Sequence, residues 1–272
     1  QKYRAKCINP RRRPEIRELT PKQRKDLFDA MKQLRNSGDQ KTNWDSFVKI
    51  HIAAKNIAHG VPLFLPWHRH FIRQFEIMLQ AINPTIMLPY WNWSIDSQAP
   101  ERSIVFTEEY FGKSGGWDNC IDTGQFSWTY SNVPEVHCIR RRFNKKPYLT
   151  AFYYPEALEI ILDTSSNYNE FYSRIGGPPH VIVHESIGGE VGDLYNTTSP
   201  NDPIFWLHHC FLDMLWWNWQ ERNGDMGMDY GGSKDATYFQ QIFPWNVNVI
   251  NVLDTKSSAE YCYYYDKWET ST

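Results

Sequence analysis

Residues 199–222 read SPNDPIFWLHHCFLDMLWWNWQER. Asn201 and Asp202 are residue types that cap helix N-termini, and the proline that follows them suits a first helical turn, so the stretch predicts one long helix. Apolar residues occupy every side of this helix, which indicates a buried core element. His208 and His209 lie in this apolar setting, where an imidazole loses its hydration and needs either a hydrogen-bonding side chain or a metal ion.

Composition limits the classes of function. The chain has 272 residues, and we expect one domain over residues 1–272. Its formal net charge of -2 predicts no electrostatic attraction to nucleic acid or to an anionic membrane. A run of about 18 apolar residues, as a membrane span requires, is absent from the sequence. The 12 Trp, 16 Tyr and 15 Phe predict a heavily aromatic core or pocket.

Hydrophobic periodicity and stop signals predict further helices before the long one. They are expected at residues 20–35, 44–57, 67–81, 155–163 and 178–188. Residues 1–19 are expected to be an irregular lead-in, and residues 88–154 an irregular region with its own packed structure. The interval that carries Glu170 has the polar character of a loop. The sequence therefore predicts a mainly α fold with long irregular loops and little β structure.

The five cysteines are widely spaced, without the CxxC pairs of a zinc ribbon. Cys210 lies inside the buried helix and is expected to stay a free thiol. The other four allow three pairings, of which we favour Cys7 with Cys262 and Cys120 with Cys138.

Two sequons for N-linked glycosylation are present, at Asn196-Thr197-Thr198 and Asn92-Trp93-Ser94. The second lies among aromatic residues and is expected to be too buried for use. Together with the cysteines and the absence of an initiator methionine, the first sequon favours a secreted or lumenal protein.

Six of the nine histidines fall into two sets of three. The sets are His51, His59 and His68, and His180, His184 and His208. His180 and His184 are four residues apart and therefore point the same way from one helix face. Imidazole ligates zinc, copper, iron or nickel, and a site without carboxylate or thiolate suits copper. The HExxH pattern of zinc proteases fails, because Gly188 follows His184 at the fourth position.

The other three histidines have less distinctive surroundings. His70 is expected to point away from His68, as a surface group or a group behind the ligands. His209, rotated away from His208 and four residues before Asp213, is interpreted as a hydrogen-bonded support. We assign no role to His137.

Two stretches resemble the copper signatures of the tyrosinase family of type 3 copper proteins. The first is His59-Gly60 followed by residues 64–69, FLPWHR, and the second is residues 199–209, SPNDPIFWLHH. Residues 88–91 (LPYW), residues 124–128, Gly188-Gly189 and the tyrosines near the C-terminus also match. The resemblance covers nearly the whole chain.

The resemblance implies a central four-helix bundle that holds two copper ions, each by three histidines. His51, His59 and His68 would bind the first copper, and His180, His184 and His208 the second. It also implies that Phe205 packs against the site, that Asn201 and Asp213 orient its surroundings, and that Arg13 pairs with the tyrosines near Tyr263.

Two further positions bear on the reaction. Val181 follows His180 where many hydroxylating members of the family carry Asn, which with a nearby Glu is thought to hold a water that deprotonates phenols. Glu170 is the candidate for that Glu, and its reading as a surface carboxylate stays open. No cysteine lies two residues before His59, where Ile57 stands, so the thioether link of several relatives cannot form.

The expected function is the oxidation of o-diphenols, with possible hydroxylation of monophenols, to o-quinones by dioxygen. Phenolic small molecules and dioxygen are the expected partners. Two alternatives remain open at this stage: an oxygen-binding module like a haemocyanin unit, and a relative that holds zinc and has no redox activity.

Overall fold

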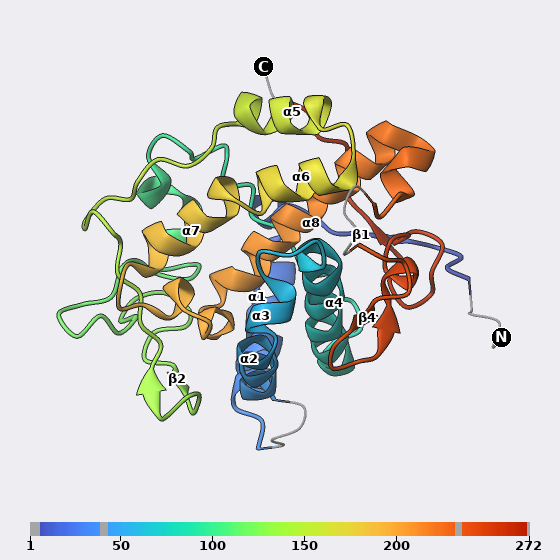
Figure 1. Cartoon of the computed structure of the whole chain (residues 1–272). Helices are drawn as coiled ribbons and strands as arrows, with labels where there is room; N and C mark the ends of the chain where they lie inside the picture. The colour runs from blue at the N-terminus through green and yellow to red at the C-terminus, as the bar shows by residue number, and fades with distance from the viewer. Residues whose placement is uncertain (1–5, 39–42, 232–235, 271–272) are drawn as a thin grey trace.

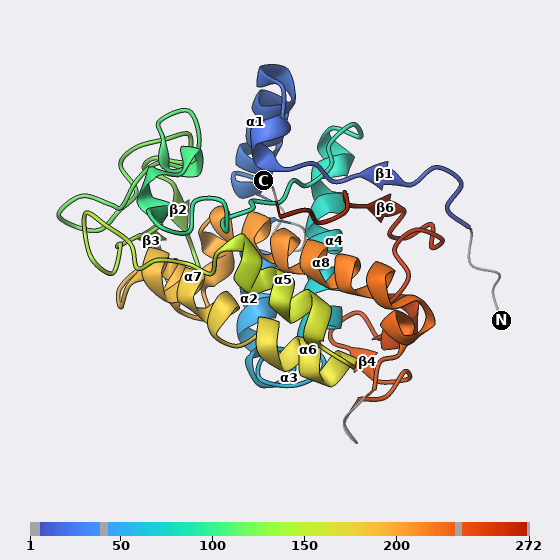
Figure 2. The same cartoon turned by 90° about the horizontal axis from the view of Figure 1, so that it is seen from above.

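The computed structural model describes residues 6–38, 43–231 and 236–270, and it is built mainly from helices (Figures 1 and 2). The α-helices are α1 (Pro21–Arg35), α2 (Trp44–Ala53), α3 (Lys55–Ala58), α4 (Phe64–Ile82), α5 (Pro155–Thr164), α6 (Tyr168–Ile175), α7 (Pro178–Gly188) and α8 (Ile204–Asn223). The short 3-10 helices are η1 (Ile16–Glu18), η2 (Pro100–Arg102), η3 (Ile104–Phe106), η4 (Asp193–Tyr195), η5 (Ser199–Asn201), η6 (Gly224–Met228) and η7 (Val249–Asn251).

Helix α8 passes through the centre of the molecule, and α4 packs along it. Every α8 residue from Ile204 to Gln220 is buried, as expected for a helix that is apolar on all sides. Aromatic rings fill the contact with α4, where Trp206 stacks on Phe75 at a centroid distance of 3.6 Å. These two helices therefore form the rigid centre on which the other histidine-bearing segments are placed.

The β structure consists of two-residue strands. They are β1 (Arg11–Arg12), β2 (Tyr130–Ser131), β3 (His137–Cys138), β4 (Gln241–Ile242), β5 (Val247–Asn248) and β6 (Tyr263–Tyr264). Strand β1 pairs in parallel with β6, and the pairs β2–β3 and β4–β5 are antiparallel. The β1–β6 pair brings the two end regions of the described chain together across the bundle (Figure 2).

Both predicted disulfides are present and Cys210 is a buried free thiol. The bond from Cys7 to Cys262 lies beside the β1–β6 pair, and the bond from Cys120 to Cys138 lies within the irregular region. A disulfide that closes a long loop restricts the unfolded chain, so the first bond ties the two end regions together.

The prediction of a mainly α fold around four histidine-bearing helices is confirmed. Thr20 caps α1 in a capping box with Gln23, as its sequence indicates. Among the described residues, the region 88–154 contains only 3-10 turns and the strands β2 and β3 as regular structure.

Three predicted boundaries are wrong. The helix expected over residues 44–57 divides at Ala54 into α2 and α3, and α4 begins one turn earlier than expected, at Phe64. The interval around Glu170 is not a loop but the amphipathic helix α6, which Asn167 caps and which buries Tyr168, Phe171 and Ile175.

Within the described segments, we find no helix with the length and apolar character that a bilayer crossing requires.

Candidate metal centre

His51, His59 and His68 converge from three different segments. His51 lies in the last turn of α2, His59 follows α3 as its C-terminal cap, and His68 lies in α4. The ring of His51 is 4.8 Å from that of His59 and 5.8 Å from that of His68, measured between centroids. Each imidazole offers a nitrogen within 4.8 Å of the others, so the three can share one metal ion.

A second group combines His180 and His184 of α7 with His208 and His209 of α8. The Nε2 atoms of His184 and His209 are 3.3 Å apart. Two nitrogens that each lie about 2.0 Å from one metal in tetrahedral geometry are separated by about 3.3 Å. The separation of this pair is therefore that of two ligands of a common ion.

The hydrogen bonds of the imidazoles show which nitrogen is free for a metal. In His51, His59, His68, His180 and His184, Nδ1 lies 2.7 to 3.3 Å from a backbone carbonyl oxygen. A carbonyl only accepts, so each Nδ1 carries the proton and each Nε2 keeps a lone pair. This arrangement is the usual one in metal sites, where the second nitrogen of a ligating histidine donates to a carbonyl.

His208 has the opposite arrangement. The indole Nε1 of Trp93 lies 3.1 Å from His208 Nδ1. An indole N–H can only donate, so this Nδ1 accepts and a neutral His208 carries its proton on Nε2. His208 Nε2 then lacks the lone pair that a metal needs, although it lies within the cluster.

His209 was interpreted from the sequence as a support bonded to Asp213, and that interpretation is wrong. Its Nε2 faces His184, and its buried Nδ1 has no hydrogen-bond partner among the described residues. The ring of His209 stacks on that of His68 at 4.2 Å and 9°, which places it between the two histidine groups. Asp213 accepts its hydrogen bonds from Arg69, Tyr263 and Tyr265 instead.

Burial holds these histidines neutral. Loss of hydration, followed by the proximity of other imidazoles, lowers the pKa of His51 to about 3. Burial likewise lowers the pKa of His184 to about 4, and it lowers the pKa of His68, His180 and His209 well below the ordinary value. Neutral imidazoles are the form that binds a metal ion.

Phe205 lies at the centre of the constellation. Its ring is 4.3 Å from that of His209 and 5.2 Å from that of His51, so it contacts both groups. It is fully buried, as the family resemblance implies. An apolar ring in this position keeps water out of the space between the two groups.

An open cavity of about 360 Å³ reaches the histidines from the surface. Four histidines of the two groups line it, and the other lining residues are Lys55, Val181, Glu185, Tyr195, Asn196, Thr197 and Ser199; the histidines are His51, His59, His180 and His184. Its volume lies in the range of small-molecule sites.

Asn201 acts on the site through a turn. Its side-chain amide donates to Asp193 Oδ1 at 3.0 Å, and Asp193 begins the η4 turn. Leu194 of the same turn accepts the Nδ1 proton of His184 at 2.7 Å. Asn201 is therefore linked through the η4 turn to the carbonyl that accepts from His184.

Glu170 is not brought to the site. It lies in the first turn of α6, where its Oε2 accepts from the backbone N–H and hydroxyl of Ser166 at 2.9 and 2.8 Å. These hydrogen bonds lower the pKa of the carboxyl group. Glu170 is absent from the cavity lining, whereas Val181 is part of it. The physical reason is that residues around 170 form a helix with its own capping interactions.

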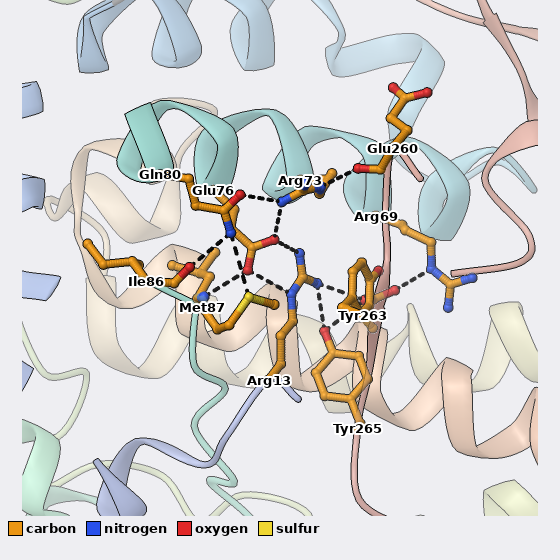
Figure 3. A network of polar contacts seen from close by, with 12 residues as sticks. Arg13, Arg69, Arg73, Glu76, Gln80, Ile86, Met87, Glu260, Tyr263 and Tyr265 are labelled. Atoms are coloured by element: carbon orange, nitrogen blue, oxygen red, sulfur yellow. Dashed lines mark hydrogen bonds and ion pairs between the residues drawn. The ribbon is translucent and has the colours of Figure 1, made fainter. Parts of the chain in front are cut away.

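Asp213 belongs to a buried polar network with Arg13, Arg69, Tyr263 and Tyr265. Figure 3 shows these four partners side by side. Arg69 Nε donates to its Oδ1 at 2.5 Å, and the hydroxyls of Tyr263 and Tyr265 donate to its Oδ2 at 2.6 and 2.8 Å. The guanidinium of Arg13 lies over the Tyr263 ring, 3.6 Å from its centroid, as the resemblance implies. The network joins the tyrosines near the C-terminus to α4 and α8.

The remaining histidines lie outside the two groups. His70 is buried, and its Nδ1 is 2.7 Å from the hydroxyl of Tyr261. His137 Nε2 lies 3.0 Å from Asp193 Oδ1, and this hydrogen bond raises its pKa.

Sequence reasoning missed Trp93, which sets the tautomer of His208, and the backbone carbonyls that orient the other imidazoles. Those of Thr197 and Leu194 are the most distant in sequence from the histidines that they orient. Every residue has a backbone carbonyl, so residue types cannot show which carbonyl accepts from a histidine. The tryptophan lies in an aromatic segment that the sequence singles out, but its partner is 115 residues away.

The residues present fit a pair of metal ions. Buried nitrogens without a hydrogen-bond partner among the described residues include Nε2 of His51, His68 and His180. Such groups are costly unless something binds them. The fold and the site together define a helical protein with two adjacent all-histidine metal sites.

The comparison with known families agrees with this description. The profile described as "Common central domain of tyrosinase" matches residues 41–222. A tyrosinase of Streptomyces glaucescens is 31% identical over 252 residues, which cover 84% of this chain and 90% of that protein. A putative tyrosinase-like protein of Caenorhabditis elegans is 30% identical, over 75% of this chain and 30% of that protein. The chain belongs to the tyrosinase family, whose fold holds a dinuclear copper site.

Solved structures share the fold. A polyphenol oxidase from Thermothelomyces thermophila superposes with a TM-score of 0.78 and 21% identity, over 95% of this chain and 89% of that one. A functional unit of octopus haemocyanin gives a TM-score of 0.65 and 19% identity, over 96% of this chain and 69% of that one. The fold therefore occurs both in an oxidase and in a haemocyanin.

Proposed function

We propose that the protein is a copper-dependent oxidase that converts o-diphenols to o-quinones with dioxygen. The observation that carries the proposal is the open cavity of about 360 Å³ that is lined by histidines of both groups. A phenolic ring can enter it and reach the metal sites. An oxygen carrier needs access only for dioxygen, so the cavity favours the oxidase over the haemocyanin-like alternative.

We further propose which residues hold the coppers. His51, His59 and His68 bind the first, with Nε2 as the donor atom in each. His180 and His184 bind the second, and His209 supplies its third ligand in place of His208. The support for this exchange is the Trp93 hydrogen bond, which leaves His208 without a lone pair toward the cluster.

Two bound coppers would supply the transfer of electrons from the phenol to dioxygen. The chain's own residues do the rest. Carbonyl acceptors orient the imidazoles, Phe205 excludes water, and Val181 borders the entering ring. A neighbouring cavity of about 440 Å³ shares Glu185 and Tyr195 with the first, so substituents of the ring have room beyond the metal site.

Glu170, the carboxylate expected to assist the hydroxylation of monophenols, accepts a hydrogen bond from Ser166 instead. Its position therefore does not support this reaction. We propose diphenol oxidation as the main reaction. The two disulfides support a secreted or lumenal location.

The test is turnover by the copper-loaded protein with L-DOPA and with tyrosine in parallel, followed by oxygen consumption and quinone absorbance. We expect quinone from L-DOPA without a lag and slower or no product from tyrosine. Reversible oxygen uptake without quinone would instead identify an oxygen carrier. Purified protein that contains zinc and takes up no oxygen would identify the redox-inactive alternative.

A further inference from the structure

The sequon at Asn196 lies at the mouth of the candidate active site. Asn196 is exposed, and it follows the η4 turn that orients His184. Its backbone is fixed, because its N–H donates to Asp193 O at 3.1 Å and its carbonyl accepts from Ser199 N at 2.9 Å. The side chain is thus presented to solvent from an ordered turn.

Asn196 and Thr197 border two cavities at once. They line the active-site cavity, and together with Thr198 they line a second cavity of about 360 Å³ that also contacts His137 and Arg140. The two residues therefore border both cavities, and we refer to them as the ridge. The carbonyl of Thr197 accepts the Nδ1 proton of His51 at 2.8 Å, so the ridge is directly connected to a candidate copper ligand.

The second sequon provides an internal contrast. Asn92 Oδ1 accepts from the backbone N–H of Ser94 at 3.2 Å and from its hydroxyl at 2.6 Å. Ser94 is completely buried. Asn92 is half-buried and its side chain is held against this buried serine, whereas Asn196 is exposed, so of the two sequons the fold presents that at Asn196 more fully to solvent.

We propose that Asn196 carries an N-linked glycan that acts as a size filter for the active site. In the modification, the Nδ2 of Asn196 loses a proton and forms a bond to the anomeric carbon of an oligosaccharide. The donor is a lipid pyrophosphate oligosaccharide, and the lipid pyrophosphate leaves with the pair of electrons of the broken C–O bond. The disulfides are consistent with passage through the compartment in which this transfer occurs.

The physical basis of the filter is excluded volume. A glycan is bulky and hydrated, and a glycan on the ridge occupies the approach to the cavity without entering the buried metal site. A free phenol can pass beside it, whereas a phenol attached to a macromolecule must bring its carrier against the sugar. This second part of the proposal rests on the proposed oxidase function, whereas the modification itself does not.

The first measurement is the mass of the peptide that contains Asn196, from protein secreted by a eukaryotic host. We expect a glycopeptide at Asn196 and an unmodified peptide at Asn92. Thr198→Ser, which keeps the sequon, is expected to retain the glycan, and Thr198→Val, which removes it, is expected to lose it. An unmodified Asn196 in the secreted wild-type protein would overturn the proposal.

The second measurement compares the folded enzyme before and after enzymatic trimming of the glycan, so that the chain stays unchanged apart from the sugar. The probes are 4-methylcatechol and albumin with coupled 3,4-dihydroxyphenyl groups. Trimming should raise kcat/KM several-fold for the albumin-bound catechol and leave that for 4-methylcatechol nearly unchanged. Equal effects of trimming on both probes would refute the size filter. If the enzyme oxidises neither probe, the proposed oxidase function is wrong, and the glycopeptide measurement still shows whether Asn196 is modified.

Discussion

Arg69 and Asp213 form a buried ion pair that joins the two central helices. Arg69 Nε donates to Asp213 Oδ1 at 2.5 Å, and both side chains are almost completely shielded from solvent. Arg69 directly follows His68 on α4, and Asp213 lies one turn after His209 on α8. The pair therefore ties α4 to α8 beside a histidine of each group, and the rings of His68 and His209 stack at 4.2 Å.

Removal of the negative charge by Asp213→Asn should destabilise the protein strongly. The substitution leaves the buried guanidinium of Arg69 without a counter-charge, and Arg13 keeps only Glu76 as a carboxylate partner. The expected loss is about 3 to 5 kcal/mol in the free energy of unfolding. Urea denaturation of the copper-free protein with intact disulfides measures it. Asp29→Asn, in an exposed pair with Lys25, is the control and should cause no measurable change.

Variants of the adjacent histidines should distinguish the third ligand of the second copper. His209→Ala should bind one copper per chain and lose catechol oxidation, because it removes a ligand nitrogen. His208→Ala should retain two coppers, since its proton lies on the nitrogen that faces the cluster. Metal analysis after dialysis gives the stoichiometry. Loss of a copper only in His208→Ala would contradict the proposed ligand set.

Trp93→Phe should change the tautomer of His208. The substitution removes the indole N–H that His208 Nδ1 accepts at 3.1 Å, which allows the proton to move to Nδ1. A buried acceptor without its donor costs about 1 to 3 kcal/mol in stability. Nitrogen-15 NMR of the copper-free protein should show a protonated Nε2 in the wild type and a larger fraction of protonated Nδ1 in the variant. An unchanged spectrum would show that Trp93 does not set the tautomer.

The copper-free protein should lose stability as the pH falls below about 6.5. His51 has its pKa lowered to about 3 and His184 to about 4, so the unfolded chain binds protons in this window while the native protein does not. The stability is fully present above the unfolded pKa, and each such histidine reduces it by about 1.4 kcal/mol per pH unit below that value.

Urea denaturation between about pH 6.5 and about pH 5 tests this expectation before most carboxyl groups titrate. His137 contributes with the opposite sign, because its hydrogen bond to Asp193 raises its pKa and favours the native state at the lower pH. A free energy of unfolding that stays constant or rises toward pH 5 would show that the buried histidines are not held neutral.

Val181→Asn alone should not create efficient hydroxylation of monophenols. The position lines the cavity, but the carboxylate expected to assist it is bound to Ser166 in α6. The ratio of the initial rates on tyrosine and L-DOPA measures the effect, with Val181→Leu as the control for side-chain size. A large rise of this ratio in Val181→Asn only would show that another group, such as Glu185 at the rim, can take the role of the carboxylate.

Much of the fold is predictable from local sequence signals. The proline and glycine signals at the helix ends and the apolar residues of α1, α5, α7 and α8 predict helices close to the observed ones, and the disulfide pairs are correct. Helix α6 was missed because its short amphipathic pattern lies in a polar interval and is recognisable mainly by the Asn167 cap. The expectation of a single domain over residues 1–272 stays a prediction.

The sequence by itself determined the family and the helical class and gave six candidate ligand histidines, because these depend on residue types and spacing along the chain. Only the tertiary structure decided how the adjacent histidines of α8 differ. That difference depends on a tryptophan and a neighbouring helix that are distant in sequence, and on the partners that Asp213 finds elsewhere. Which imidazole nitrogen carries the proton depends on the groups that pack against the ring, and the spacing of residues along the chain does not reveal those groups.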